Sequence, residues 1–448
     1  MVPVKTGEIY SVKISSVSSD GNGAAHISSF AVFVPNTVPG DYAQIKIESV
    51  KNRYATASLY KIITPSPHRR TAPCTVCGEC GGCPFQCMDY ARQLEEKRSI
   101  AENAMRRLGG FSDFAFDEII GSGNEFYYRN KVIFQTGYTG DSKKAMGFFK
   151  RKSHEVVPAD KCMLISREMN KIAEFINKNS DGISFYDERT KQGELKSVFL
   201  RSTQSGDIMV ALSANKKISD EVFELFSKLK RFENVKSAYA NVYKNSSFPE
   251  CRHIFGDTHL EEEILGVRFD ISPQSFFQVN HAQAKRLYKK ALELADISEG
   301  DTVMDIYCGT GTISLAAAKY AGAVVGIEAV DAAIADAKKN AEKNGISNAE
   351  FFAGRAEEVV PRLVDEGFSP DTVILDPPRA GSDTQTLDAI VRANPKRIVY
   401  VSCNPATLAR DIKYLHAHGF SPTASAAVDM FPQTAHVECV VAMNRDRK

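Results

Sequence analysis

The sequence contains no long hydrophobic run. No stretch of about 18 apolar residues, the shortest that readily crosses a bilayer, occurs in its 448 residues. Residues 1–8 also lack the apolar segment of a secretory signal peptide. Neither sign of charge dominates, because 56 Lys and Arg stand against 55 Asp and Glu. We therefore expect a cytoplasmic protein with no membrane partner, while the net charge of +1 does not identify a partner.

What is present is typical of a large folded protein. Hydrophobic residues make up 43% of the chain and charged residues 25%. A chain of this length is too long to fold around one ordinary hydrophobic core, so we expect roughly three domains. In a reducing compartment the ten cysteines are expected to be thiols or metal ligands rather than disulfides.

The first 64 residues predict a small antiparallel β-barrel. Turn residues at 21–23 and 39–40 separate short β-rich runs, which cover residues 8–17, 31–34, 41–51 and 54–63. Basic residues outnumber acidic ones in this segment, which makes it a candidate for contacts with backbone phosphates or else an ordinary solvated surface. The pattern around Gly7-Glu8-Ile9, 21–26, 33–35 and 38–41 resembles a TRAM domain, an OB-like module of RNA-modifying enzymes.

Five cysteines lie within fourteen residues, from Cys74 to Cys87, and glycines separate them. Thiols at two-residue gaps suit either a zinc site or an iron–sulfur cluster, and the residues alone do not choose between these metals. A disulfide framework is a further alternative. Cys162 stands alone and by itself is typical of a core residue.

The segment that follows mixes strands and helices. A charged helix is expected over 89–109, strands over 127–134, 196–200 and 208–212, and helices over 166–179 and 219–230. We place the domain boundaries so that residues 1–64 form the barrel, 65–270 a central domain and 271–448 the last domain.

From Asp301 onward strands and helices alternate, which predicts an α/β fold with a doubly wound parallel sheet. The expected strands cover residues 302–307, 323–328, 350–352, 372–376 and 397–402. Ligands of such sheets bind beyond the carboxyl ends of the strands.

The first of these strands ends in a glycine turn. The run Asp305-Ile306-Tyr307-Cys308-Gly309-Thr310-Gly311 lets the backbone approach a ligand, and Glu328 ends the next strand, where an acid accepts hydrogen bonds from ribose hydroxyls. A nicotinamide dinucleotide site would want glycine or alanine at position 314, where serine stands. The run resembles motif I of S-adenosylmethionine-dependent methyltransferases, and Asp376-Pro377-Pro378-Arg379 on the fourth strand strengthens that resemblance.

Cys403 follows the fifth strand directly. Asn404 is a natural N-cap and Pro405 a natural first helical residue, so we expect the thiol beside a positive helix N-terminus that lowers its pKa. A buried core cysteine is the alternative. In the last strand, alternation places His436 and Glu438 on one face, where Glu438 is either functional or a solvated acid.

A cysteine beside a methyl donor indicates pyrimidine chemistry. Oxygen and nitrogen acceptors attack a methyl donor directly, whereas C5 of a pyrimidine becomes nucleophilic only after a thiolate has added to C6. A base must then remove the C5 proton before elimination frees the enzyme. Cys403 as nucleophile and Glu438 as base supply these roles.

The chain resembles the RNA uracil-5-methyltransferase family, the TrmA and RumA group, over nearly its whole length. The resemblance rests on residues 402–411, 376–381 and 436–438. It implies a class I S-adenosylmethionine methyltransferase domain of Rossmann-like, doubly wound topology, preceded by an OB-like TRAM barrel and a mixed α/β central domain with a [4Fe-4S] cluster. The TRAM-like start and the cysteine segment favour the branch that methylates 23S rRNA.

The resemblance also implies roles for single residues. Cys403 matches the nucleophile, Glu438 matches the proton acceptor, and Phe276 would stack on the flipped uracil. The positions that would contact S-adenosylmethionine are Gln278, Tyr307, Gly309, Gly311, Glu328 and Asp376. The cluster ligands would be Cys74, Cys80, Cys83 and Cys162, whereas Cys77 and Cys87 depart from the family pattern.

We therefore predict a monomeric 23S rRNA (uracil-C5)-methyltransferase that uses S-adenosylmethionine and makes 5-methyluridine. One alternative is a methyltransferase of the tRNA T-loop, and another is a non-catalytic RNA-binding protein on the same scaffold. A radical methylthiotransferase is disfavoured because the cysteine spacing that it requires does not occur. The target uridine is not encoded in any motif of the sequence.

Overall fold

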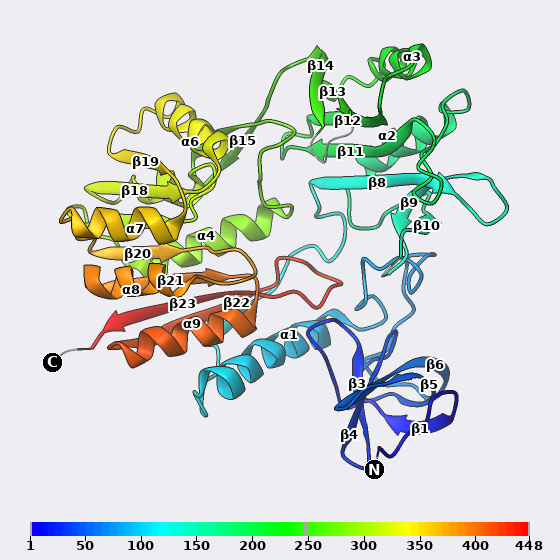
Figure 1. Cartoon of the computed structure of the whole chain (residues 1–448), viewed down its shortest axis with the longest axis horizontal. Coiled ribbons are helices and arrows are strands. Elements are labelled where there is room, and N and C mark those ends of the chain that lie inside the picture. The colour runs from blue at the N-terminus through cyan, green and yellow to red at the C-terminus, as the bar shows by residue number, and fades with distance from the viewer. Residues whose placement is uncertain (1, 152, 245–248, 447–448) are drawn as a thin grey trace. The chain divides into compact units, whose positions relative to one another are not determined.

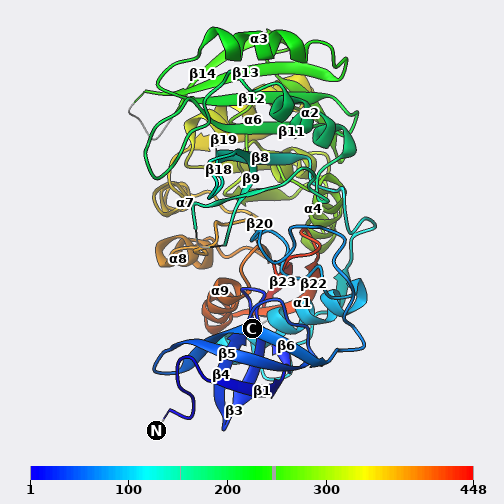
Figure 2. The same ribbon diagram turned by 90° about the vertical axis from the view of Figure 1, so that its right-hand side faces the viewer.

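The computed structural model describes residues 2–151, 153–244 and 249–446. These residues form two compact units (Figures 1 and 2). The first unit comprises residues 1–96, 124–260 and 431–435, and the second comprises 97–123, 261–430 and 436–448. The division into three domains stays a prediction. No helix in the described part of the chain is long and apolar enough to cross a membrane.

A six-stranded barrel-like sheet opens the first unit and appears in blue in Figure 2. Its strands are β1 (Ile9–Lys13), β2 (Ser16–Val17), β3 (Gly23–Ile27), β4 (Phe30–Val34), β5 (Tyr42–Val50) and β6 (Tyr54–Thr64), in the order β1-β5-β6-β4-β3-β2. Side chains alternate between the two faces, because successive residues of a strand point to opposite sides. Val12, Val32, Ile45 and Ile47 therefore form a shared core.

A seven-stranded sheet forms the centre of the first unit, in the order β10-β9-β8-β11-β12-β13-β14. The strands are β8 (Lys131–Tyr138), β9 (Lys144–Phe149), β10 (Val156–Pro158), β11 (Leu195–Ser202), β12 (Ile208–Asn215), β13 (Val235–Tyr243) and β14 (Glu250–Gly256). Helices α2 (Arg167–Lys178) and α3 (Asp220–Leu229) pack on one face of it. The side chains of Ser166 and Ser219 cap these two helices, which explains why both helices begin where they were predicted.

One strand of this sheet starts later than predicted. We expected a strand from residue 127, but β8 begins at Lys131 because Tyr127 has a positive φ of 57° and its N–H donates to the carbonyl of Met163. The expected helix over 89–109 is α1 (Tyr90–Ala104), which continues as a π-helical turn, η1 (Met105–Gly109).

The second unit is built on an eight-stranded sheet, in the order β19-β18-β17-β20-β21-β23-β22-β7. Its strands are β7 (Glu118–Ile120), β17 (Thr302–Ile306), β18 (Ala323–Glu328), β19 (Ala349–Ala353), β20 (Thr372–Leu375), β21 (Arg397–Ser402), β22 (Phe420–Val428) and β23 (Glu438–Arg445). The strands from β19 to β21 are parallel, and β23 runs antiparallel to both β21 and β22. A separate hairpin consists of β15 (Leu260–Ile264) and β16 (Val267–Ile271).

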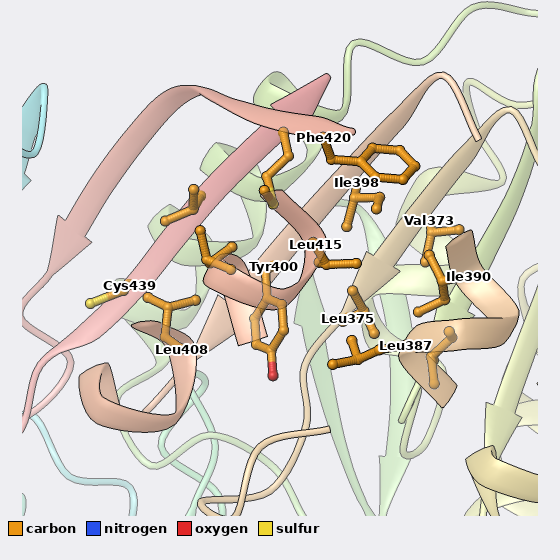
Figure 3. Close-up of a cluster of buried hydrophobic side chains, with 14 of the residues drawn as sticks. Val373, Leu375, Leu387, Ile390, Ile398, Tyr400, Leu408, Leu415, Phe420 and Cys439 are labelled. Atoms are coloured by element: carbon orange, nitrogen blue, oxygen red, sulfur yellow. The ribbon is translucent and has the colours of Figure 1, made fainter. Parts of the chain in front are cut away.

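Helices cover this sheet, as the doubly wound pattern predicted. They are α4 (His281–Ala295), α5 (Thr312–Ala317), α6 (Asp331–Lys343), α7 (Ala356–Asp365), α8 (Thr384–Ala393) and α9 (Pro405–Ala417). Figure 1 shows α7, α8 and α9 beside one another on one side of the sheet. Their apolar side chains pack with those of the strands into a continuous core, part of which Figure 3 shows around Tyr400, Leu415 and Phe420.

Candidate active site

Most of the predicted site residues of the second unit lie at the carboxyl edge of its sheet. Ile306 of β17 pairs with Ile327 of β18 and with Leu375 of β20, and Leu375 pairs with Tyr400 of β21. The residues that follow these strand ends therefore start from neighbouring points, because parallel strands end at the same edge. Tyr307, Glu328, Asp376 and Cys403 are all brought to this edge.

The glycine turn after β17 has the shape expected of a ligand cradle. Gly309 and Gly311 have φ values of 56° and 83°, and Tyr307 has a φ of 70°, which is uncommon for a residue with a Cβ. The N–H of Gly309 donates to Oε2 of Glu328 over 3.2 Å, and the N–H of Val330 donates to Oε1 over 2.9 Å. Glu328 is thus held beside the turn, where a ribose would reach it.

Two carboxyl groups lie at the ends of strands β17 and β20: Asp305 is buried and Asp376 is half-buried. Burial raises the pKa of Asp305 to about 7 and that of Asp376 to about 6. The hydroxyl of Ser314 donates to Oδ2 of Asp305 over 2.5 Å, while Oδ1 has no partner among the described residues. The serine that excluded a dinucleotide motif therefore has a structural role in holding Asp305.

Cys403 sits where the sequence predicted, at the start of α9. Oδ1 of Asn404 accepts from the N–H of Ala406 over 3.1 Å, and Pro405 is the first helical residue. We predicted that the helix N-terminus lowers the pKa of this thiol, and that prediction is wrong. Burial, followed by the charges of Glu438 and Asp376, raises the pKa of Cys403 to about 11 and outweighs the helix N-terminus.

Among the charged groups around that thiol, Glu438 raises its pKa the most. Ser402 of β21 pairs with Cys439 of β23 in antiparallel register, so Cys403 and Glu438 come next along two adjacent strands. Glu438 is 4% exposed, and burial raises its pKa to about 8, with Asp376 adding to the shift. The interpretation of Glu438 as a solvated acid is therefore excluded. Our placement of His436 on the same strand face is wrong, because β23 begins only at Glu438.

The segment before α4 holds the two remaining predicted residues of this unit. Phe276 is 70% exposed, which is unusual for a phenylalanine and leaves its ring available for stacking. Gln278 shares a hydrogen bond with the hydroxyl of Tyr288 on α4. Asn280 caps α4 by accepting from the N–H of Gln283 over 3.2 Å, which ties this segment to the helix.

Sequence reasoning missed two residues of this edge. Tyr288 is buried, and its pKa is raised by burial and then by the charges of Asp376, Glu438 and Asp305. A tyrosine at helical spacing is typical of a core residue, so no sequence signal distinguished Tyr288 from ordinary core residues. Arg379 was quoted within a motif without a role, yet its positive charge acts to lower the pKa of both Cys403 and Glu438.

Six cysteines of the first unit are free thiols in loops: Cys74, Cys77, Cys80, Cys83, Cys87 and Cys162. Burial raises the pKa of Cys83 to about 12, and the charges of Cys162 and Cys80 add to the shift. Cys80 is influenced in turn by Cys74, so the four predicted ligands are neighbours. Within residues 2–151, 153–244 and 249–446, however, no group of three or more Cys, His, Asp or Glu side chains has the geometry of a metal site. The predicted iron–sulfur centre is not confirmed.

The other two cysteines of this segment interact with each other. Cys77 and Cys87 share a hydrogen bond that lowers the pKa of Cys87 to about 6, with Arg69 favouring the thiolate as well. The side chain of Asn170 bonds to the backbone of Cys162 on both sides, accepting from its N–H over 2.8 Å and donating to its carbonyl over 3.0 Å. Cys162 is thereby held in place from the adjoining helix α2.

Comparison with known proteins identifies the family. Residues 89–446 match the family described as tRNA (Uracil-5-)-methyltransferase, and residues 3–60 match the TRAM domain. An uncharacterized RNA methyltransferase of Bacillus cereus is 39% identical over 457 residues and covers 100% of this chain and 98% of its own. An uncharacterized RNA methyltransferase of Caldanaerobacter subterraneus is 39% identical over 453 residues, and the match covers 99% of this chain and 100% of that protein.

A solved structure is similar over almost the whole chain. The tRNA (uracil-54, C5)-methyltransferase of Pyrococcus abyssi, in complex with S-adenosyl-L-homocysteine, is 30% identical with a TM-score of 0.78, and the match covers 97% of this chain and 100% of that one. Together with the match that spans residues 89–446, these relatives show that the chain belongs to the tRNA (uracil-5-)-methyltransferase family, in the TrmA and RumA group, and carries a TRAM domain.

Proposed function

We propose that this protein transfers a methyl group from S-adenosylmethionine to C5 of a uracil in RNA. The observation that carries the proposal is the adjacency of Cys403 and Glu438 at the sheet edge that also holds Glu328 and the glycine turn. The structure in complex with S-adenosyl-L-homocysteine, 30% identical to this chain, supports the identity of the cofactor. A methyltransferase acting on oxygen or nitrogen would need neither the thiol nor the buried base.

The two residues have complementary roles in this reaction. The thiolate of Cys403 adds to C6 of the uracil, which makes C5 nucleophilic. S-adenosylmethionine, when bound, supplies the methyl group that C5 takes. Glu438 then removes the C5 proton, the C5–C6 double bond re-forms and the bond between C6 and Sγ of Cys403 breaks. Arg379 favours the ionised form of both residues, and Phe276 would stack on the extruded base.

Covalent trapping tests this mechanism. RNA that contains 5-fluorouridine has no C5 proton to lose, so the adduct with Cys403 should persist in the presence of S-adenosylmethionine. The Cys403→Ala variant should form no adduct. The control is Cys251→Ala, which removes a thiol on β14 of the other unit and should form as much adduct as the unmodified protein. With ordinary uridine, Glu438→Gln should accumulate the methylated adduct. An adduct that survives in Cys403→Ala would refute the mechanism.

For the substrate, we propose 23S rRNA, because the chain combines a TRAM domain with the cysteine-rich segment. The similarity to a tRNA (uracil-54, C5)-methyltransferase favours tRNA as a second candidate. Mapping 5-methyluridine in both RNAs from a deletion strain separates the two, since only the true target loses its modification.

We also propose that Cys74, Cys80, Cys83 and Cys162 hold a [4Fe-4S] cluster. The support is chemical: the four are neighbouring free thiols in a half-buried site, while Cys77 and Cys87 share a hydrogen bond with each other. Protein purified without oxygen should contain about four iron atoms per chain and absorb visible light. Cys162→Ala should lose most of the iron and Cys251→Ala none. Zinc in place of iron would refute the cluster.

A further inference from the structure

A row of three polar side chains along helix α6 has no part in the roles proposed above. Asp336, Asn340 and Asn344 follow one another at intervals of four residues, with Asn344 as the C-cap, so they lie on one face of the helix. Asn340 is 1% exposed, which means that its amide has been taken out of water. A buried amide is costly unless hydrogen bonds satisfy it, and the groups that it binds therefore indicate its role.

The two asparagines complete the free edge of the β15–β16 hairpin. Oδ1 of Asn344 accepts from the N–H of Arg268 over 2.9 Å, and its Nδ2 donates to the carbonyl of Arg268 over 2.7 Å. Oδ1 of Asn340 accepts from the N–H of Asp270 over 3.2 Å. The spacings match, because four helical residues rise about 6 Å and two strand residues about 7 Å. The asparagines thus take the place of a neighbouring strand beside β16.

The third member of the row reaches the loop that follows the hairpin. The hydroxyl of Ser275 donates to Oδ2 of Asp336 over 3.3 Å. Ser275 is also fixed by Ser272, since each hydroxyl accepts from the N–H of the other residue, over 3.0 and 3.1 Å. Phe276 follows Ser275 directly, and Gln278 comes two residues later. The row on α6 therefore holds the segment that carries both of these predicted site residues.

The same helix contacts the glycine turn after β17. Nδ2 of Asn340 donates to the carbonyl of Thr310 over 3.3 Å. A Cβ built on Gly311 would lie 3.3 Å from Cβ of Ala337, so the turn and the helix are in close contact. Asn340 therefore binds the hairpin through its oxygen and the turn through its nitrogen. The two bonds fix the orientation of the amide, because an N–H needs the oxygen and a carbonyl needs the NH₂ group.

We propose that Asn340 is a positioning residue, which holds the segment of Phe276 and Gln278 at a fixed distance from the glycine turn that takes S-adenosylmethionine. Methyl transfer requires reacting atoms about 3–3.5 Å apart, and a displacement of about 1 Å can slow a reaction about 100-fold. The proposal rests on the proposed function in taking the base and the cofactor as the groups that these two segments hold. Asn340 acts on the reaction only through the two segments.

Hydrogen exchange tests the positioning without any reaction. In Asn340→Ala the backbone amides of residues 272–280 should exchange about tenfold faster than in the unmodified protein, which is the effect of losing a buried hydrogen bond. Asn348→Ala is the matched control, because Nδ2 of Asn348 donates to the carbonyls of Ala318 and Ala321 at the C-terminal end of α5. If this segment exchanges equally fast in the two variants, Asn340 does not hold it and the proposal is wrong.

The rate of methyl transfer tests the consequence. In a single turnover with saturating RNA and S-adenosylmethionine, Asn340→Ala should be slowed about 10- to 100-fold, while the Kd of S-adenosyl-L-homocysteine should stay within about threefold. Asn348→Ala should keep the rate of the unmodified protein. A loss of cofactor affinity equal to the loss of rate would place the effect at the cofactor site and overturn the positioning role.

Thermal unfolding of each variant establishes that it is folded at the assay temperature. Should Asn340→Ala fail to fold, Asn344→Ala carries both tests, because it releases the same strand at Arg268 and is only half-buried. It should then exceed Asn348→Ala in exchange over residues 272–280 and fall below it in rate. If the unmodified protein methylates no uracil, the proposed function fails, and the exchange experiment still decides whether Asn340 holds the segment.

Discussion

The hydroxyl of Tyr400 donates a hydrogen bond to Oδ2 of Asp411 over 2.5 Å, and both side chains are buried. The N–H of Ser382 donates to the same oxygen over 2.9 Å, and Nε of Arg410 donates to Oδ1 over 2.7 Å. Ser382 also shares a hydrogen bond of 3.1 Å with the hydroxyl of Tyr307. Asp411 therefore connects strand β21, helix α9 and the loop after β20, and through Ser382 it reaches the glycine turn.

Tyr400→Phe should lower the free energy of unfolding by about 1.5–3 kcal/mol, because it removes a buried hydrogen bond to a carboxylate without opening a cavity. Tyr414→Phe is the control. Its hydroxyl donates to Asp388 at the surface, where water replaces the lost bond. Urea denaturation of both variants checks the prediction, and equal losses would contradict a special role for the buried bond.

Gly381→Ala should be more destabilising than Gly419→Ala. Both glycines have a positive φ, 79° and 87°, so both variants carry the backbone strain of about 1 kcal/mol. A Cβ at Gly381 would lie 2.6 Å from both Nη2 of Arg410 and Oδ2 of Asp411, whereas a Cβ at Gly419 meets open space. The crowding should add about 1–3 kcal/mol. Thermal unfolding of the two variants measures the difference, and its absence would mean that the loop after β20 yields freely.

Lys97→Met should destabilise the second unit by about 3–5 kcal/mol, because it leaves the charge of Asp429 buried without its ion pair. Both side chains are fully buried and in contact. The double variant Lys97→Met/Asp429→Leu should recover most of the loss, since an apolar pair has no charge to desolvate. Chemical denaturation of the three proteins tests this. A double variant that is less stable than Lys97→Met would contradict it.

The Glu438 carboxyl should make stability depend on pH. Its pKa is about 8 in the folded protein against 4.5 in a solvated chain, so between these values the folded state binds more protons than the unfolded one. The contribution of this carboxyl to the free energy of unfolding is therefore fully present below pH 4.5. It is lost as the pH rises through about 8. Glu438→Gln should gain stability relative to the unmodified protein from pH 6 to pH 9. A difference that is constant over that range would contradict the raised pKa.

Cys403 should react slowly with iodoacetamide at neutral pH. Its pKa of about 11 leaves little thiolate, so alkylation should rise steeply above pH 9. Arg379→Ala should shift the profile to still higher pH, because the charge of Arg379 acts to lower the pKa. Mass spectrometry of the peptide with Cys403 gives the rate. A midpoint below pH 9 would show that the helix N-terminus prevails over burial.

Much of the fold could be predicted from the sequence because its signals are local. Turn residues, hydrophobic periodicity and the alternation of strands with helices indicated the barrel, helices α2 and α3, and the parallel strands from β17 to β21. The two errors in strand starts have specific causes. Tyr127 has a positive φ, and the strand pairing of β23 begins only at Glu438. Neither feature leaves a mark in the hydrophobic pattern.

The sequence by itself determined which functional groups reach the sheet edge, because the end of each strand and the start of α9 are set by nearby residues such as Asn404 and Pro405. Only the tertiary structure decided their ionisation. Cys403 was expected to be a thiolate from its own helix, but burial and the charges of Glu438 and Asp376, both distant in the sequence, raise its pKa instead. A pKa depends on everything that surrounds the group, and that environment exists only once β20, β21 and β23 lie side by side.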